Sequence, residues 1–142
     1  MEIRVSFPGG KRVDAHFGDR VVRTDQGPEY GGEGSAPAPF DVFLASLAAC
    51  AGVYVLGFCQ ARNLPMDGIE ITQSHDTNPE SGRLDRVRIS IRVPAGFPEK
   101  YVPALERVAA KCAVKRVIQD PPEFVIEAKA AGASSEQPRP LG

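Results

Sequence analysis

The chain has 142 residues, enough for one domain with a buried core. Apolar residues make up 42% of it and charged residues 25%, as in a typical globular protein, and its net charge is −1. Because basic and acidic side chains are interspersed, the charge pattern argues against nucleic acid as a partner. Three cysteines and an N-terminus without the pattern of a signal peptide lead us to expect a reduced, cytoplasmic protein. With two histidines and no Cys-x-x-Cys pair, we expect no structural zinc site.

The first elements of the chain are predicted to be strands. Apolar and polar residues alternate over residues 3–7 and again over residues 13–17, on either side of the turn at residues 8–10. This pattern predicts a hairpin with one packed face. A third short strand is expected around residues 21–22. The loop over residues 26–38, rich in Gly and Pro, is expected to be a plain connector, with a lid over a site as the alternative.

A long apolar helix is predicted from Pro39 to near Asn63. Proline at the start and the acid Asp41 in the first turn are typical of a helix N-terminus, and Pro65 follows its end. Residues 42–59 approach the length of a membrane span. Their many Ala and Gly residues and their lack of basic or aromatic flanks favour instead a central core helix that is buried on every side. We therefore expect no membrane contact.

The second half of the chain is predicted to begin with two more strands. One strand starts at Ile69, and a polar turn over residues 76–82 follows it. Residues 87–93 alternate between apolar and polar side chains and give the clearest strand pattern in the chain. Pro94 ends this strand.

A helix and a final strand are predicted to complete the domain. The helix is expected to run without interruption from Pro98 or Pro103 to Ile118, because two prolines follow at residues 121–122. Residues 124–128 alternate as the last strand.

The domain is expected to span residues 1–129. Residues 130–142 are small, polar and contain proline, so they are predicted to form a disordered tail. Antiparallel strands with a few helices packed against them define an α+β fold.

Cysteines fall on the predicted core faces of the two helices. Cys112 continues the helical spacing of Leu105, and Cys50 shares a face with Leu47. Cys59 lies nine positions after Cys50, which turns it to the opposite side of the same helix. Cys50 and Cys112 are therefore the better couple for a disulfide, provided that their Cα atoms come within about 7 Å. Free cysteine is also a common buried hydrophobe, so an inert role in the core remains the alternative.

Positive charge is absent beside Cys50 in the sequence. Any group that stabilises its thiolate must therefore be brought to it by the fold. Lys111, Lys115 and Arg116 lie near Cys112 and are expected to be solvated surface charges rather than activating groups.

The run from Pro39 to Cys50 contains an acid at Asp41, and Cys112 follows 62 positions after Cys50 in the context Cys-Ala-Val. This arrangement resembles the osmotically inducible protein C (OsmC) and organic hydroperoxide resistance superfamily, in its OsmC-like branch. The resemblance covers residues 1–128, including the order of strands and helices. It implies an intertwined α+β homodimer with the two long helices at its centre. It also implies a thiol peroxidase that uses neither metal nor haem.

The resemblance implies a catalytic role for both cysteines. Cys50 would be the peroxidatic thiol, oxidised by an organic hydroperoxide to a sulfenic acid. Cys112 would resolve it to an intrasubunit disulfide, which an external dithiol reductant returns to thiols. Phe43, Leu47 and Tyr54 would supply apolar walls that suit an organic hydroperoxide.

The chain departs from hydroperoxide-reducing members of this superfamily at the start of the long helix. Those members look to share a glutamate directly after the proline. This chain has Phe40 at that position and carries its acid one place later, at Asp41. Helix capping is the expected role of Asp41. Those members also hold the thiolate with an arginine near the N-terminal strands, for which Arg12, Arg20 and Arg23 are candidates. The alternative function is therefore an OsmC-like redox sensor or small-molecule binder.

Overall fold

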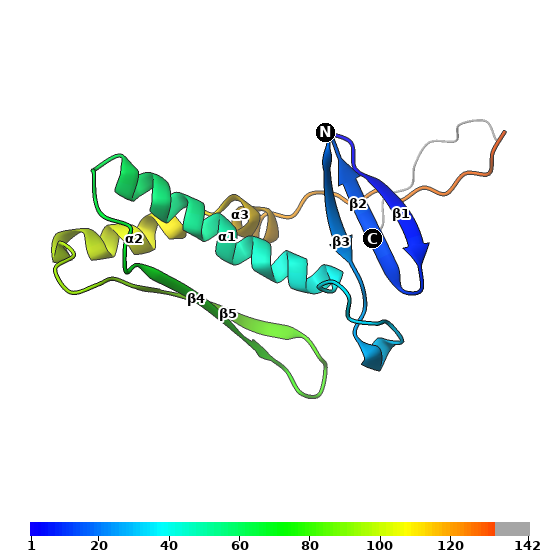
Figure 1. Cartoon of the computed structure of the whole chain (residues 1–142), viewed down its shortest axis with the longest axis horizontal. Helices are drawn as coiled ribbons and strands as arrows, with labels where there is room; N and C mark the ends of the chain where they lie inside the picture. The colour runs from blue at the N-terminus through cyan, green and yellow to red at the C-terminus, as the bar shows by residue number, and fades with distance from the viewer. Residues whose placement is uncertain (133–142) are drawn as a thin grey trace.

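The computed structural model describes residues 1–132, in which two antiparallel sheets accompany one long helix (Figure 1). The first sheet contains, in this order, β1 (Arg4–Gly9), β2 (Arg12–Phe17) and β3 (Arg20–Thr24). The second sheet contains β4 (Glu70–Thr77) and β5 (Leu84–Arg92). The α-helices are α1 (Pro39–Gln60), α2 (Val102–Ala109) and α3 (Ala113–Gln119). Antiparallel strands with packed helices confirm the predicted α+β class.

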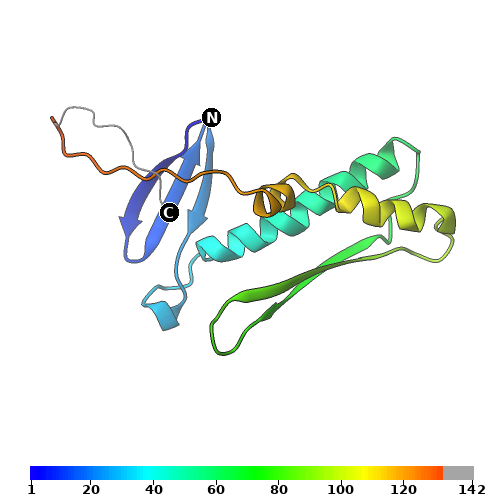
Figure 2. The same ribbon diagram turned by 180° about the vertical axis from the view of Figure 1, so that it is seen from behind.

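The N-terminal sheet lies beyond the start of α1, at one end of the molecule (Figures 1 and 2). Its pairing sets Val5 opposite Ala15 and Ala15 opposite Val22, so the predicted hairpin and third strand are present. The expectation that one face of this hairpin packs is wrong for a single chain. Phe7, for example, is 78% exposed. The physical reason is that α1 runs along the other sheet and leaves this one without a cover within residues 1–132.

The loop between β3 and α1 is folded around the buried carboxylate of Asp25. This carboxylate accepts hydrogen bonds from the backbone N–H of Gln26 (2.8 Å), Glu33 (3.3 Å) and Ser35 (3.0 Å), and from the Ser35 hydroxyl (2.8 Å). A short 3₁₀ turn, Pro28–Tyr30, lies within the loop. The loop is therefore ordered, and its shape depends on one acidic side chain.

Helix α1 begins at Pro39, where the proline ring fits the first helical position. Its buried face carries Leu44, Leu47, Ala51, Val55 and Cys59. The helix ends at Gln60, three residues before the predicted end, and Asn63 adopts a left-handed conformation with φ 52° just beyond it. Its length and apolarity match those of a membrane span, as they also do for core helices of soluble proteins.

The opposite face of α1 is not covered by the chain. Val53 on this face is 65% exposed, and Leu56 is also exposed. The prediction that the helix is buried on every side is therefore wrong for one chain, because the hairpin and α2 cover only one side of it.

The core lies between α1, α2 and the β4–β5 hairpin. Val55, Cys59, Phe97 and Leu105 form its buried centre. Alternation along the hairpin turns Ile71 and its partner Ile91 towards this centre, as the period of two predicts. The Gln73 amide nitrogen donates to the Leu44 carbonyl oxygen at 2.9 Å and ties β4 to α1.

The helix predicted over residues 98–118 is interrupted, which corrects the sequence prediction. A 3₁₀ turn (Glu99–Tyr101) leads into α2, and α2 ends at Ala109. Cys112 has the non-helical dihedral angles φ −44° and ψ 123° and precedes α3 as its N-cap. Cys112 is therefore not inside a helix. It is buried all the same, as predicted, with 1% of its surface exposed.

The last predicted strand, residues 124–128, is not formed within the described part of the chain. This segment is extended and has a single bridge residue, Val125. Phe124 is 65% exposed, since no neighbouring strand runs alongside to complete a ladder. The segment leads back towards the end of the molecule that holds the N-terminal sheet (Figure 2). The predicted disordered tail, residues 130–142, lies outside the described residues from position 133 onward, and the domain boundary at residue 129 stays a prediction.

Candidate active site

The fold brings Cys50 and Cys112 together from segments far apart in the sequence. Cys50 is half-buried on α1, and Cys112 is buried at the turn between α2 and α3. The Cys112 side chain is close enough to Cys50 to contribute to the lowering of the Cys50 pKa. All three cysteines are free thiols in this structure. Two neighbouring thiols are the minimum that reversible disulfide chemistry requires.

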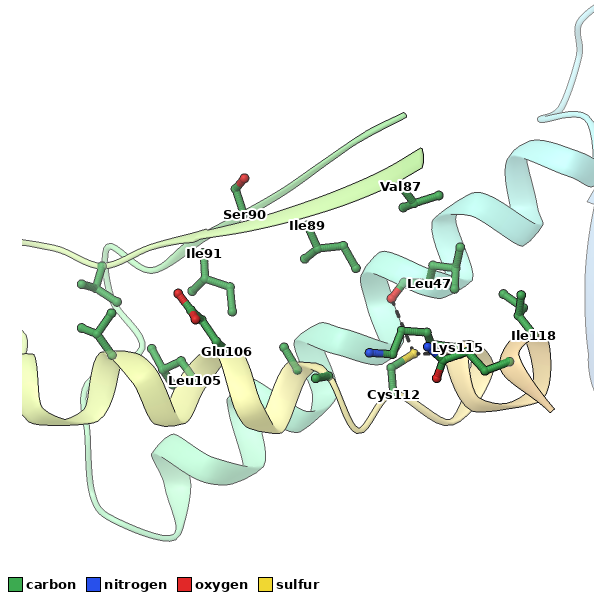
Figure 3. Close-up of a pocket in the computed structure, with 15 residues that line it drawn as sticks. Leu47, Val87, Ile89, Ser90, Ile91, Leu105, Glu106, Cys112, Lys115 and Ile118 are labelled. Carbon is green, nitrogen blue, oxygen red and sulfur yellow. Dashed lines mark hydrogen bonds between the residues drawn. The ribbon is translucent and has the colours of Figure 1, made fainter. Parts of the chain in front are cut away.

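Cys112 is held by contacts to two helices. Its Sγ accepts a hydrogen bond from the backbone N–H of Lys115 at 3.5 Å and so caps the N-terminus of α3. Its thiol also donates towards the carbonyl oxygen of Leu47 on α1, at a sulfur–oxygen distance of 4.0 Å. Both contacts are drawn as dashed lines in Figure 3. They fix the position of this sulfur beside α1.

The surroundings of Cys50 favour its thiolate. The backbone N–H of Val114 lowers the pKa of Cys50 most, followed by the side chain of Cys112. The N–H of Ala113 and the positive charge of Arg116 lower this pKa further, and together these effects outweigh the desolvation that raises it. The sequence missed the backbone donors, because α3 was not predicted to begin after Cys112.

The third cysteine has the opposite character. Cys59 is fully buried in the core cluster, on the side of α1 away from Cys50. Burial raises the pKa of the Cys59 thiol, and the positive charge of Arg62 offsets this only in part. Burial thus disfavours the Cys59 thiolate, and the separation of Cys59 from Cys50 agrees with the helical spacing.

The charge that acts on Cys50 comes from an unexpected part of the chain. Arg12, Arg20 and Arg23 lie on β2 and β3 in the N-terminal sheet. Within residues 1–132, none of the three is among the groups that shift the pKa of Cys50. Arg116 on α3, expected to be only a solvated charge, is one of them.

The start of α1 is built for helix capping. The Asp41 carboxylate accepts a hydrogen bond from the backbone N–H of Ala38 at 3.2 Å, which is the expected capping role. Phe40 stacks on Phe43 with 5.5 Å between ring centroids. Phe40 lies ten positions before Cys50 in the sequence.

An apolar cavity of about 780 Å³ reaches Cys112. It lies between β5 on one side and α2 and α3 on the other, with Leu47 of α1 among its lining residues (Figure 3). Its apolar walls are formed by Val87, Ile89, Ile91, Val93, Val102 and Leu105. Glu106, Lys115 and Gln119 add polar groups.

The cavity differs from the apolar pocket expected from the sequence. Of the three predicted wall residues, only Leu47 lines it, while Phe43 and Tyr54 do not. The inner face of β5 supplies much of the wall in their place. The alternation over residues 87–93 marked this face as apolar, but it gave no sign that a cavity would form against α2.

A metal centre has no ligand set in this region. Among residues 1–132, no group of three His, Cys, Asp or Glu side chains lies close enough to hold a metal ion. The groups that the fold gathers here are two thiols, backbone N–H donors and the wall of an apolar cavity.

Known proteins match the chain at the level of family and fold. The family model described as OsmC-like protein matches residues 32–127, so the chain belongs to the OsmC-like family. No curated protein matches the chain significantly.

Solved structures share the fold at low sequence identity. A Psychrobacter arcticus protein, described as an osmotic stress induced and detoxification response protein, has a TM-score of 0.68 and 21% identity, covering 80% of this chain and 85% of its own. An OsmC-like protein of Mycoplasma pneumoniae has a TM-score of 0.63 and 18% identity, covering 83% and 86%. An organic hydroperoxide resistance protein OsmC of Legionella pneumophila has a TM-score of 0.51 and 21% identity, covering 84% and 90%. These likenesses confirm the OsmC-like fold.

Proposed function

We propose that this OsmC-like protein is a thiol peroxidase that reduces organic hydroperoxides, with Cys50 as the peroxidatic and Cys112 as the resolving cysteine. One observation supports the proposal most: the two thiols are neighbours, and the backbone N–H groups of Val114 and Ala113 favour the thiolate form of Cys50. Thiolate character is what makes a cysteine nucleophilic. The Legionella pneumophila protein with the same fold is described as an organic hydroperoxide resistance protein, which agrees with this reaction class.

The first step oxidises Cys50. Its thiolate attacks the distal oxygen of the hydroperoxide, a sulfur–oxygen bond forms and the oxygen–oxygen bond breaks. The alkoxide takes up a proton and leaves as an alcohol, and the sulfur becomes a sulfenic acid. The peroxide is thereby reduced by two electrons.

The second step forms a disulfide. The sulfur of Cys112 attacks the sulfenic sulfur of Cys50, a sulfur–sulfur bond forms, and water leaves. This pairing would protect Cys50 from further oxidation. An external dithiol then restores both thiols by two exchange reactions and is itself oxidised to a disulfide.

The apolar cavity supports an organic rather than an inorganic peroxide. Its volume of about 780 Å³ falls in the range of small-molecule sites, and its walls are mostly aliphatic. Cys112 lines this cavity, so an apolar substituent could occupy it while the peroxide group lies at the thiols.

A homodimer is part of the proposal. The uncovered face of α1, with Val53 and Leu56, the N-terminal sheet and the extended segment around Phe124 all expose large apolar side chains. Contiguous exposed apolar surface is characteristic of interfaces, and a second copy could cover all three. We also propose a cytoplasmic location, since three free cysteines suit a reducing compartment.

The alternative function is a redox sensor or a small-molecule binder. Two observations favour it: Phe40 takes the place of the glutamate expected in a peroxidase, and the cavity is lined by Cys112 but not by Cys50. A binder would occupy the cavity without turnover.

Peroxide consumption tests the proposal. Cumene hydroperoxide is supplied with dithiothreitol to the wild type, Cys50→Ser, Cys112→Ser and the control Cys59→Ala. We expect turnover in the wild type and in Cys59→Ala, and loss of turnover to background in Cys50→Ser. Cys112→Ser should lose the disulfide found by mass spectrometry. Absence of turnover in the wild type with several peroxides would refute the peroxidase and leave the alternative.

A further inference from the structure

Helix α3 starts at the redox pair itself. The first N–H groups of a helix have no partner within the helix and need a cap. In α3 the N–H of Lys115 is bound by the Cys112 sulfur at 3.5 Å, and the N–H groups of Ala113 and Val114 act on the Cys50 sulfur. The N–H groups in the first turn of this helix thus face two cysteine sulfurs.

Helix α3 packs against α1 but has no buried side chain of its own. It has seven residues and buries none of them, and both Val117 and Ile118 are exposed. An isolated helix needs about 12–15 residues to be even marginally stable in water. Helix α2, in contrast, is anchored by the fully buried side chain of Leu105. The cap therefore matters more for α3 than for α2.

Helix α3 also forms one side of the cavity. Gln119 is one of its lining residues. Lys115 and Ile118 also line it and lie opposite Val87 and Ile89 of β5 (Figure 3). If α3 lost its helical structure, the shape of the cavity next to Cys112 would change.

We infer that α3 is a redox-controlled gate: a disulfide between Cys50 and Cys112 removes its sulfur cap, loosens residues 113–119 and opens the cavity. The inference rests on the pairing of these cysteines in the proposed function. A disulfide requires a sulfur–sulfur distance of about 2.05 Å and a fixed torsion, which pulls the Cys112 sulfur towards α1. In the disulfide the Cys50 sulfur also carries no negative charge, so it accepts hydrogen bonds from the N–H groups of Val114 and Ala113 less well than the Cys50 thiolate does.

In the catalytic cycle the gate would act after oxidation. The reduced state holds α3 in place and keeps the cavity closed around an apolar substituent. The oxidised state loosens α3, which lets the alcohol leave and gives a dithiol access to the disulfide. In a sensor, the same change would displace the exposed apolar side chains of Val117 and Ile118 and so alter the surface that they form.

Hydrogen–deuterium exchange measured by mass spectrometry tests the gate. The full-length protein is compared in dithiothreitol and after oxidation with diamide, whose azo bond takes up two electrons and two protons as the two thiols form a disulfide. We expect the amides of residues 113–119 to exchange about fivefold faster in the oxidised protein, the size expected for loss of a helix cap. The amides of α2 should keep their rates.

Two variants separate the cap from the disulfide. Cys112→Ser keeps an oxygen that can cap a helix but forms no disulfide, so diamide should leave its α3 exchange unchanged. Cys112→Ala has no cap, so its α3 should exchange fast without any oxidant. If a variant does not fold, the comparison of reduced and oxidised wild-type protein still tests the gate.

The outcomes for the gate and for the peroxidase are distinct. A Cys50–Cys112 disulfide confirmed by mass with unchanged exchange in α3 would overturn the gate. Failure of diamide to form this disulfide would also overturn it. Because diamide needs no peroxidase activity, a protein without peroxide turnover can still show the gate.

Discussion

The carbonyl oxygen of Leu47 lies 4.0 Å from the sulfur of Cys112, although 65 positions separate the two residues. Leu47 is almost one helical turn before Cys50 on α1, so this contact sets the start of α3 beside the half-buried thiol. The position of Cys50 relative to the N–H groups of α3 follows from it. The lowering of the Cys50 pKa thus depends on how the turn at Cys112 packs against α1.

The lowered pKa of Cys50 predicts that this thiol reacts with iodoacetamide at a lower pH than an ordinary cysteine, because alkylation requires the thiolate. Arg116→Gln removes one of the stabilising charges and should move the midpoint of the pH–rate profile upwards. Arg107→Gln, an exposed charge on α2, is the matched control and should leave the midpoint unchanged. The rates are measured from the mass of the Cys50 peptide. An unmoved midpoint in Arg116→Gln would argue against a role for that charge.

The buried carboxylate of Asp25 predicts an acid-sensitive loop. The N–H of Ser35 lowers the pKa of Asp25 most, with its hydroxyl next, so the folded-state pKa lies below the ordinary value of 3.8. The resulting stabilisation is present above that ordinary value and is lost as the pH falls through the lowered pKa. Asp25→Asn should therefore reduce stability at neutral pH and weaken its dependence on pH in the acid range.

Limited proteolysis at neutral pH checks the same residue locally. Asp25→Asn loses part of the hydrogen bonding that folds residues 26–35, so we expect faster cleavage within this loop. Asp67→Asn, at an exposed turn, is the control. Equal cleavage rates in the two variants would show that Asp25 does not hold the loop.

Leu105 is the main anchor of α2, with 1% of its surface exposed. Leu105→Ala should lower the free energy of unfolding by about 2–5 kcal/mol, since it removes buried surface and leaves a cavity. Arg107→Ala on the same helix should change it by no more than about 0.5 kcal/mol. Urea unfolding followed by circular dichroism gives both values, and a small loss in Leu105→Ala would mean that α2 contributes little to the core.

The exposed face of α1 predicts that the proposed dimer depends on Val53. Burying a valine contributes about 1.5–3 kcal/mol, and a glutamate at the same place would bury an unpaired charge. Val53→Glu should therefore sediment as a monomer in analytical ultracentrifugation. Thr72→Glu, on the exposed side of β4, should keep the assembly of the wild type. A Val53→Glu protein with unchanged assembly would exclude this face as the interface.

Most secondary-structure elements could be predicted because their patterns are local. Alternation with a period of two gives β1, β2 and β5, and proline with a capping acid gives the start of α1. The interruption before α3 could not be predicted, because nothing in Ala-Lys-Cys-Ala breaks a helix by itself. Cys112 leaves the helical conformation where its sulfur contacts both Leu47 and Lys115, and the first of these contacts is long-range.

The sequence by itself determined the α+β class, the two long-separated cysteines and the choice of Cys50 over Cys59, since helical geometry turns Cys59 to the other side. Only the tertiary structure decided that α3 begins at Cys112, that its N–H groups and Arg116 act on Cys50, and that the cavity lies between β5 and α2. The physical reason is the range of the interactions. Periodicity and capping act within a few residues, whereas a thiol pKa and a cavity depend on groups that only packing brings together.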